Sequence, residues 1–196
     1  MNNFFALISR MKYIERWALM RNSRPENLSE HSLEVAMIAH ALCVIGNTRF
    51  EKALDANKAA LIGLYHDASE IITGDMPTPV KYYNQDIRSA YKEVEAVAQK
   101  RLLERLPEDM RDVYEDIFFG TKDENDVYMR RLVKAADKLS AFIKCIEEGQ
   151  AGNGEFRTAK QSLSDLLSDL SAELPEVRVF MKDFLPPYGS TLDELN

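Results

Sequence analysis

Apolar residues recur every three or four positions along most of this 196-residue chain, which is the spacing of one face of an α-helix. In the first such stretch, residues 3–15, the repeating apolar residues are Phe4, Leu7, Ile8, Met11 and Ile14. The same pattern predicts helices over residues 29–45, 56–73, 86–105, 107–120, 127–148 and 155–172, and a shorter helix from Pro175. The tail, residues 186–196, predicts an extended cap with a final turn. No stretch has a strong strand pattern, so the sequence predicts an all-α fold.

The distribution of apolar side chains indicates which helices form the core. The predicted helix 29–45 is apolar nearly all round, which is typical of a helix in the centre of a helical domain. Residues 59–65 are equally apolar, so we expect these two helices to pack together. No internal repeat, low-complexity tract or flexible linker interrupts the sequence. We therefore expect one helical-bundle domain over residues 1–196, with its core at about 29–148 and the C-terminal helices, about 155–196, packed on it.

Composition and charge are those of an ordinary globular protein. Apolar residues make up 45% and charged residues 29%, and the net charge of −7 argues weakly against binding a nucleic-acid polymer or an anionic membrane. Cys43 and Cys145 lie in apolar helical context, and we expect buried free thiols, as a reducing compartment allows. No apolar run reaches the roughly 18 residues of a membrane span, and the N-terminus lacks a basic leader pattern. We expect a cytoplasmic protein.

One stretch gathers ionisable side chains at the end of an apolar run. His66 and Asp67 are adjacent, Glu70 follows about one helical turn later, and Asp75 comes after Gly74, which is expected to end the helix. On a continuous helix His66 and Glu70 would share a face. Burying these groups is costly unless a metal ion or another partner compensates them.

The other candidates for such a site lie on separate predicted helices. His31 is at the start of the helix 29–45, where a side chain can reach a cleft, whereas His40, nine positions later, points to the opposite side. The two cannot serve one site, and we interpret His40 as a core residue. Asp137 lies at the edge of an apolar stripe. On pattern alone it is either a surface partner of a neighbouring lysine or an inward-facing ligand.

Residues 16–25 break the helical periodicity and end at a proline, so we expect a loop there. The loop holds Trp17, the only tryptophan, and three arginines. It is either a solvated basic segment with Trp17 at the edge of the core, or an anion-binding loop in which an arginine fork matches phosphate and Trp17 offers a flat face to a sugar or base. Residues 76–84, with two prolines, are expected to form a second loop.

The order His31, His66-Asp67, Asp137 resembles the signature of the HD superfamily of metal-dependent phosphohydrolases. Two imidazoles and two carboxylates suit a divalent transition metal, which polarises a phosphate and lowers the pKa of a bound water. Within that superfamily the chain resembles the bacterial HD-domain 5′-deoxynucleotidase family. The segments that carry this closer resemblance are Arg16-Trp17, Ser29–Leu33, Tyr65–Glu70, Thr73–Pro79 and residues 134–137.

The resemblance implies a single HD domain and a role for each candidate residue. The implied metal ligands, for one divalent cobalt, manganese or copper ion per site, are His31, His66, Asp67 and Asp137. Glu70 would serve the attacking water, Arg16 would orient the phosphate, and Trp17 would pack on the deoxyribose and disfavour a ribose 2′-hydroxyl. The residues implied to line the nucleotide site are Asp75, Met76, Pro77 and Thr78. Members of the family are homodimers that tolerate different bases, so a homodimer is implied as well.

The expected activity is metal-dependent hydrolysis of deoxyribonucleoside 5′-monophosphates to deoxyribonucleoside and phosphate. Direct attack by water is favoured, because no recognisable motif supplies a nucleophilic side chain. Other HD-type activities stay open: a dNTP triphosphohydrolase, a cyclic-nucleotide phosphodiesterase or an alarmone hydrolase. Three histidines make a binuclear, His-rich phosphodiesterase site hard to assemble, and a triphosphate would require more basic residues. The alternative from another class is a non-catalytic, nucleotide-binding helical module.

Overall fold

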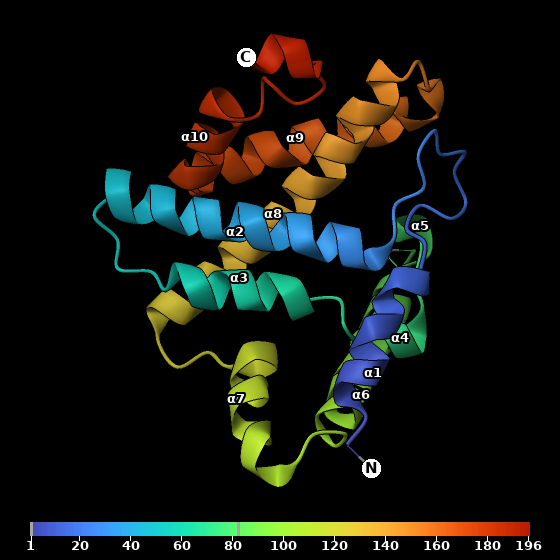
Figure 1. Ribbon diagram of the computed structural model, residues 1–196, viewed down its shortest axis with the longest axis vertical. Helices are drawn as coiled ribbons and strands as arrows, with labels where there is room; N and C mark the ends of the chain where they lie inside the picture. The colour runs from blue at the N-terminus through green and yellow to red at the C-terminus, as the bar shows by residue number, and fades with distance from the viewer. Residues whose placement is uncertain (1, 82) are drawn as a thin grey trace. The chain divides into compact units, whose positions relative to one another are not determined.

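This computed structural model describes residues 2–81 and 83–196, except for the side chain of Thr78. Helices make up the regular structure of these residues (Figure 1). No strand occurs in these residues, and one isolated bridge joins Glu15 to Asn27. The all-α prediction is therefore confirmed. The chain divides into two compact units. The first comprises Met1–Leu19, Pro25–Ser32 and Tyr65–Gly120, and the second Met20–Arg24, Leu33–Leu64 and Thr121–Asn196. The expectation of one domain over the whole chain stays a prediction.

The first unit is built around a cluster of aromatic and leucine side chains. Its elements are α1 (Phe4–Ile8), the 3-10 helix η1 (Ser9–Tyr13), the first turn of α2, α4 (Glu70–Thr73), α5 (Thr78–Lys81), α6 (Gln85–Leu103) and α7 (Glu108–Phe119). Phe4 is 1% exposed, and its ring centroid lies 5.0 Å from that of Tyr114 at an edge-on angle. The other buried members of the cluster are Ala68, Leu102, Leu103, Leu106 and Phe118. Removing these side chains from water is the main stabilising contribution within this unit.

The second unit packs long helices along one another. Its elements are α2 (Leu28–Arg49) from Leu33 onward, α3 (Ala56–Tyr65) as far as Leu64, α8 (Glu124–Gln150), the 3-10 helix η2 (Gly154–Phe156), α9 (Arg157–Glu173), α10 (Pro175–Asp183) and the terminal turn η3 (Leu192–Leu195). α2 and α3 run side by side (Figure 1), and a β-carbon built on Gly63 would lie only 2.8 Å from the α-carbon of Ala36. The expected packing of these two helices is confirmed, and a glycine permits their close approach.

The first predicted helix is shorter than its apolar pattern indicated. It consists of α1 and η1, and the chain becomes extended at Ile14, with φ −101° and ψ 111°. There the backbone N–H of Leu28 donates to the carbonyl of Ile14, and that of Arg16 donates to the carbonyl of Glu26, both at 2.9 Å. These bonds join the two ends of the predicted loop 16–25.

The predicted helix 56–73 is interrupted where its charged residues begin. α3 ends just before His66, residues 66–69 form tight turns, and α4 begins at Glu70. Backbone bonds in this segment span three residues, as does the bond from the N–H of Glu70 to the carbonyl of Asp67 at 2.9 Å. The expectation that His66 and Glu70 share one face of a continuous helix is therefore wrong.

Gly74 ends α4 as predicted, with a left-handed φ of 73° that glycine adopts without strain. Residues 74–77 then run without regular structure. The expected loop 76–84 is wrong in part, because it contains the single turn of α5, which begins directly after Pro77. Proline at this position has no N–H to lose, so it is compatible with the start of a helical turn.

α2 continues past residue 45, the predicted end of this helix, and ends at Arg49. The carbonyl of Gly46 accepts a bond from the N–H of Phe50 at 3.0 Å. Asn47 bonds both the N–H and the carbonyl of Leu54, at 2.8 and 2.9 Å, and so ties the connection to α3 against the end of α2. Tertiary contacts of this kind outweigh the weak helix propensity of one glycine.

One face of α2 is exposed although the helix is apolar nearly all round. Leu33, Met37 and Val44 are 54%, 59% and 39% exposed, and His40 lies on the same stripe and is also exposed. The interpretation of His40 as a core residue is wrong. α2 also has the length and composition of a membrane span, against our expectation that no such run exists; 56% of that window is buried inside the protein, as in a core helix.

Candidate active site

Two histidines and an aspartate of the first unit come together. Asp67 Oδ2 lies 2.9 Å from His66 Nε2 and 3.7 Å from His31 Nε2, and the two imidazole centroids are 5.3 Å apart. One ligand atom from each residue lies within 4.8 Å of the other two. His31 is fully buried, and the other two side chains are half-buried. The structure brings these three predicted ligands together, and their role as ligands stays a prediction.

Local sequence fixes where these side chains lie. Asn27 caps α2, because its Oδ1 accepts bonds from the N–H groups of Ser29 and Glu30 at 3.0 and 3.1 Å. This cap puts His31 in the first turn of the helix. The tight turns after α3 bury Ala68 in the apolar cluster of the first unit. The two residues before this alanine are His66 and Asp67, which lie beside His31.

The donor set of this cluster fits a divalent transition metal, for which imidazole nitrogen and carboxylate oxygen are usual ligands. Glu70 is 6% exposed, and its Oε2 makes no hydrogen bond with the residues that the structure describes. Burial, together with the charges of Asp67 and Asp75, raises the pKa of Glu70 to about 9, although Lys81 and Arg16 oppose the shift. A cation beside Asp67 would relieve this excess of negative charge. The residues present therefore fit the metal that the resemblance implies.

Arg16, Trp17 and Asp75 are also neighbours in the first unit. The guanidinium of Arg16 donates from Nη1 to Glu26 Oε2 at 2.6 Å and lies 5.8 Å from the centroid of the Trp17 ring. The backbone N–H of Trp17 donates to the carboxylate of Asp75. Burial raises the pKa of Asp75, which Arg16 opposes. A cation, an aromatic face and a carboxylate are thus brought together, which is chemistry suited to a phosphorylated sugar.

The remaining predicted residues are divided between the two units. Met76 and Pro77 are half-buried in the segment before α5, and the side chain of Thr78 lies outside the described part of the structure. Asp137 belongs to the second unit, on α8, where it is half-buried and its Oδ2 accepts a bond from Lys138 Nζ at 2.9 Å. The roles of all four, including Asp137 as a fourth metal ligand, stay predictions.

Three polar residues beside the site were missed by the sequence analysis. Lys81 Nζ donates to Glu95 Oε1 at 2.8 Å and lies 4.6 Å from the ring centroid of Tyr91, and its charge reaches Glu70. Glu95, on the charged α6, is therefore part of the surroundings of the site. The four-residue spacing of Tyr91 and Glu95 indicates that they share one face of the predicted helix. No local sequence pattern indicates that Lys81 lies beside them.

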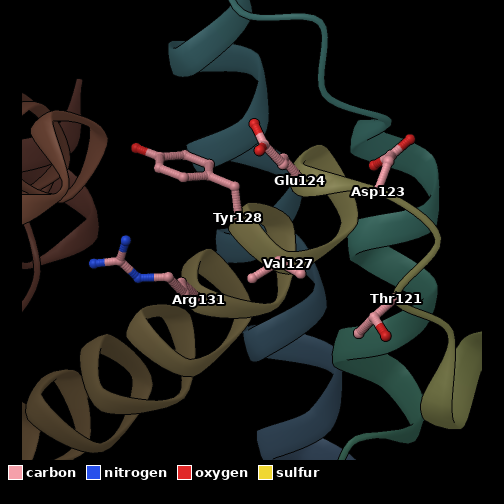
Figure 2. A pocket seen from close by; sticks show the side chains of 6 residues that line it. All are labelled: Thr121, Asp123, Glu124, Val127, Tyr128 and Arg131. Atoms are coloured by element: carbon pink, nitrogen blue, oxygen red, sulfur yellow. The ribbon is translucent and has the colours of Figure 1, made fainter.

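A cavity of about 470 Å³ lies elsewhere, around the start of α8 in the second unit. Figure 2 shows the side chains of Tyr128 and Arg131 extending to one side of the helix, and those of Asp123 and Thr121 lying on the other. Glu124 and Val127 complete the lining. No residue of the predicted site lines this cavity.

Solved structures define the class to which this fold belongs. An HD-domain phosphohydrolase from Listeria innocua matches with a TM-score of 0.80 over 97% of this chain and 90% of its own, at 22% sequence identity. The cyanophage S-2L HD phosphohydrolase DatZ, solved with dA and one catalytic Zn²⁺ ion, matches with a TM-score of 0.50 over 72% of this chain and 69% of its own, at 21% identity. The fold is that of the HD-domain phosphohydrolases.

Sequence comparison defines the family within that class. The model of the YfbR-like 5′-deoxynucleotidases matches residues 3–188. A 5′-deoxynucleotidase of Shewanella oneidensis is 47% identical over 196 residues, which cover 100% of this chain and 98% of the relative. The chain belongs to the YfbR-like 5′-deoxynucleotidase family and is an enzyme, which confirms the resemblance found in the sequence.

Proposed function

We propose that this protein hydrolyses deoxyribonucleoside 5′-monophosphates to deoxyribonucleosides and phosphate. The observation that carries the proposal is the grouping of His31, His66 and Asp67 next to a buried acid and near an arginine, all within the first unit. Membership of a family named for this activity supports the same substrate class. A phosphate ester needs positive charge and a positioned water for its hydrolysis, and the grouping offers the residues for both.

The metal ligands in this proposal are His31, His66 and Asp67, with Asp137 as a further ligand. A divalent cation held there supplies positive charge beside the phosphate and a water molecule of lowered pKa. Imidazole and carboxylate donors suit cobalt, manganese or copper, which are the metals we propose.

Arg16 is proposed to orient the phosphate. Its hydrogen bond to Glu26 fixes the guanidinium, because a partly buried carboxylate holds one nitrogen while the fork carries further N–H donors. The side chains of Arg16 and Glu26 are 12% and 13% exposed, so this ion pair is not a mobile surface contact. A guanidinium restrained in this way loses little conformational freedom when it binds an anion.

Glu70 is proposed to exchange the proton at its Oε2 with the attacking water or with the leaving 5′-oxygen. The buried position of this carboxyl group and the raised pKa are the properties of a group that can hold a proton near neutral pH. Trp17 is proposed to pack on the deoxyribose, and the hydrogen bond from its backbone to Asp75 connects it to the segment Asp75–Thr78 that lines the nucleotide site.

Phosphate release measured with dAMP, AMP, dATP and cyclic AMP, each with added Co²⁺, tests the activity. We expect dAMP to be hydrolysed fastest, and no release in excess chelator. Faster release from dATP or cyclic AMP would move the protein to another HD-type activity. Binding of Co²⁺ and dAMP without any turnover would instead favour the non-catalytic module.

We further propose a homodimer, and the exposed stripe of Leu33, Met37 and Val44 on α2 supports it, because apolar side chains on a helix surface gain by association. Met37→Glu should then halve the mass measured by light scattering, and an unchanged mass would exclude this stripe as the dimer interface.

The two free, buried cysteines support a cytoplasmic location. A single domain over the whole chain completes the proposal.

A further inference from the structure

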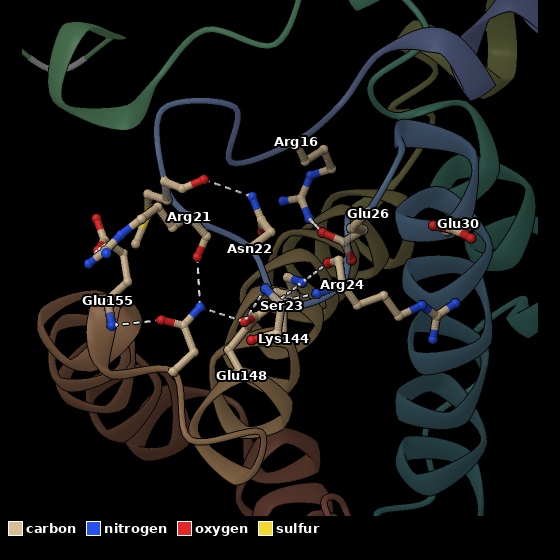
Figure 3. A network of polar contacts seen from close by, with 12 residues as sticks. Arg16, Arg21, Asn22, Ser23, Arg24, Glu26, Glu30, Lys144, Glu148 and Glu155 are labelled. Atoms are coloured by element: carbon tan, nitrogen blue, oxygen red, sulfur yellow. Dashed lines mark hydrogen bonds and ion pairs between the residues drawn. The ribbon is translucent and has the colours of Figure 1, made fainter.

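A buried acid on α8 holds the backbone of residues 20–24, the part of the loop that belongs to the second unit. Glu148 is 2% exposed, and its Oε2 accepts a bond from the N–H of Ser23 at 2.8 Å. Its Oε1 accepts bonds from the N–H of Arg24 at 3.3 Å and from Lys144 Nζ at 2.5 Å. Figure 3 shows these contacts, with the carboxylate of Glu148 directed at the Ser23 backbone.

Two further side chains hold the carbonyl groups of the same segment. Lys144 Nζ donates to the carbonyl of Arg24 at 2.5 Å. Asn153 Nδ2 donates both to the carbonyl of Arg21 and to Glu148 Oε2, each at 2.7 Å. We call Lys144, Glu148 and Asn153 the clamp. Surface loops usually leave their backbone groups to water, so a loop held at both N–H and carbonyl groups by buried side chains is unusually restrained.

The charges of the clamp are matched. Burial acts to raise the pKa of Glu148, but the hydrogen bonds from Lys144, Ser23 and Asn153 outweigh it and lower the pKa to about 2. Breaking a buried, hydrogen-bonded ion pair is costly because it leaves a charge without compensation. The carboxylate of Glu148 therefore keeps its charge well below neutral pH.

The clamped segment lies close in sequence to the proposed phosphate and sugar contacts. Only Ala18 and Leu19 separate Trp17 from residue 20, and the two ends of the loop are joined by the bonds between residues 14–16 and 26–28. Trp17 has a φ of 57°, a left-handed conformation that a non-glycine residue keeps only where the surroundings impose it. With its ends joined and residues 20–24 held, the loop leaves the short piece that carries Arg16 and Trp17 little freedom to relax.

We infer that the Lys144–Glu148–Asn153 clamp is a positioning device for the nucleotide: by fixing residues 20–24 it holds Arg16 and Trp17 ready for the substrate. The inference rests on the proposed function. A loop that is already ordered loses less entropy when it binds, so the clamp lowers KM. Its three side chains act through the loop and not on the reacting atoms, so kcat depends on them little.

The test uses Trp17 as a reporter, since it is the only tryptophan of the chain. Acrylamide quenching of its fluorescence is compared between the full-length wild type and the variants Glu148→Gln and Asn153→Ala, alongside kcat and KM for dAMP with saturating Co²⁺. Asn153→Ala leaves the Lys144–Glu148 pair intact, so it carries the test if Glu148→Gln does not fold. The matched control is Glu155→Gln, which removes only the exposed ion pair to Arg21 at the same loop.

We expect the quenching constant of both clamp variants to rise at least twofold and KM to rise five- to tenfold, with kcat within twofold of wild type and the control unchanged. Unchanged quenching in a folded clamp variant would overturn the inference. A clamp variant with more quenching but an unaltered KM, or with a fall in kcat alone, would also overturn the inference. If the wild type releases no phosphate from dAMP, the proposed function fails, while the quenching comparison still decides whether the clamp restrains the loop.

Discussion

Replacing Glu70 with glutamine should stabilise the metal-free protein while it abolishes turnover. The carboxyl group of Glu70 is 6% exposed, and burial together with Asp67 and Asp75 raises its pKa from a usual 4.5 to about 9. The unfolded chain therefore releases a proton above about pH 4.5 that the folded protein keeps, and folding becomes less favourable as the pH rises toward 9. Glutamine has nearly the same shape and does not titrate, so the variant avoids this cost.

The magnitude follows from the distance between the assay pH and the pKa of the unfolded chain. Each pH unit costs about 1.4 kcal/mol, so at pH 7 the variant should gain up to about 3 kcal/mol in free energy of unfolding. At pH 5 the same reasoning leaves less than about 1 kcal/mol. A gain of the larger size should raise the Tm of a chain of this length by roughly 6 to 12 °C.

Urea unfolding followed by circular dichroism, at pH 5 and pH 7 and with excess chelator, measures this gain. In parallel, kcat with Co²⁺ should fall by a factor of about 10² to 10⁴, the usual contribution of a proton-transferring residue. Asp165→Asn, at an exposed acid on α9, is the control for removing one negative charge. A variant no more stable than wild type at pH 7, or equally stabilised at both pH values, would refute the electrostatic reasoning. A near-normal kcat would refute the role in proton transfer.

Four shorter predictions concern the same regions. Arg16→Lys should raise KM for dAMP about tenfold, because an ammonium group lacks the planar fork that pairs with phosphate; an unaltered KM would remove Arg16 from the phosphate site. Trp17→Ala should narrow the ratio of kcat/KM between dAMP and AMP, whereas equal losses on both would exclude it as the sugar discriminator. Co²⁺ should raise the Tm of the wild type reversibly, and His31→Gln should remove most of that shift; a full shift in the variant would contradict ligation by His31. Glu148, with its pKa lowered to about 2, contributes stability above about pH 4.5 that is lost as the pH falls toward 2, so acid titrations of wild type and Glu148→Gln should converge over that range.

Residue types and their order were enough to group part of the site. His31 and His66-Asp67 lie at the ends of two strongly apolar segments, and the structure does bring them together. The break between α3 and α4 was not predictable, because the apolar pattern continues through it. At the break Ala68 packs into the apolar cluster of the first unit, and a small apolar residue gives no local sign of a turn.

Polar contacts between distant residues were the least accessible to sequence reasoning. Lys144 and Glu148 are four positions apart on α8, a spacing that predicts an ordinary surface ion pair. Whether such a pair is exposed or buried depends on which segment covers it, and here residues 20–24 do so from more than a hundred positions away. The same holds for Lys81 and Glu95, whose pairing brings together the turn of α5 and the helix α6.

The burial of both cysteines makes this protein chemically quiet toward thiol reagents. Cys43 and Cys145 are free and inaccessible, and burial, with Glu176 and Asp55, raises the pKa of the Cys43 thiol to about 12. Labelling reagents attack thiolates at the surface, so neither residue would compete with a cysteine introduced there. Leu19→Cys, at a side chain that is 78% exposed and two residues from Trp17, would therefore accept a single spin label or fluorophore without prior removal of the native thiols.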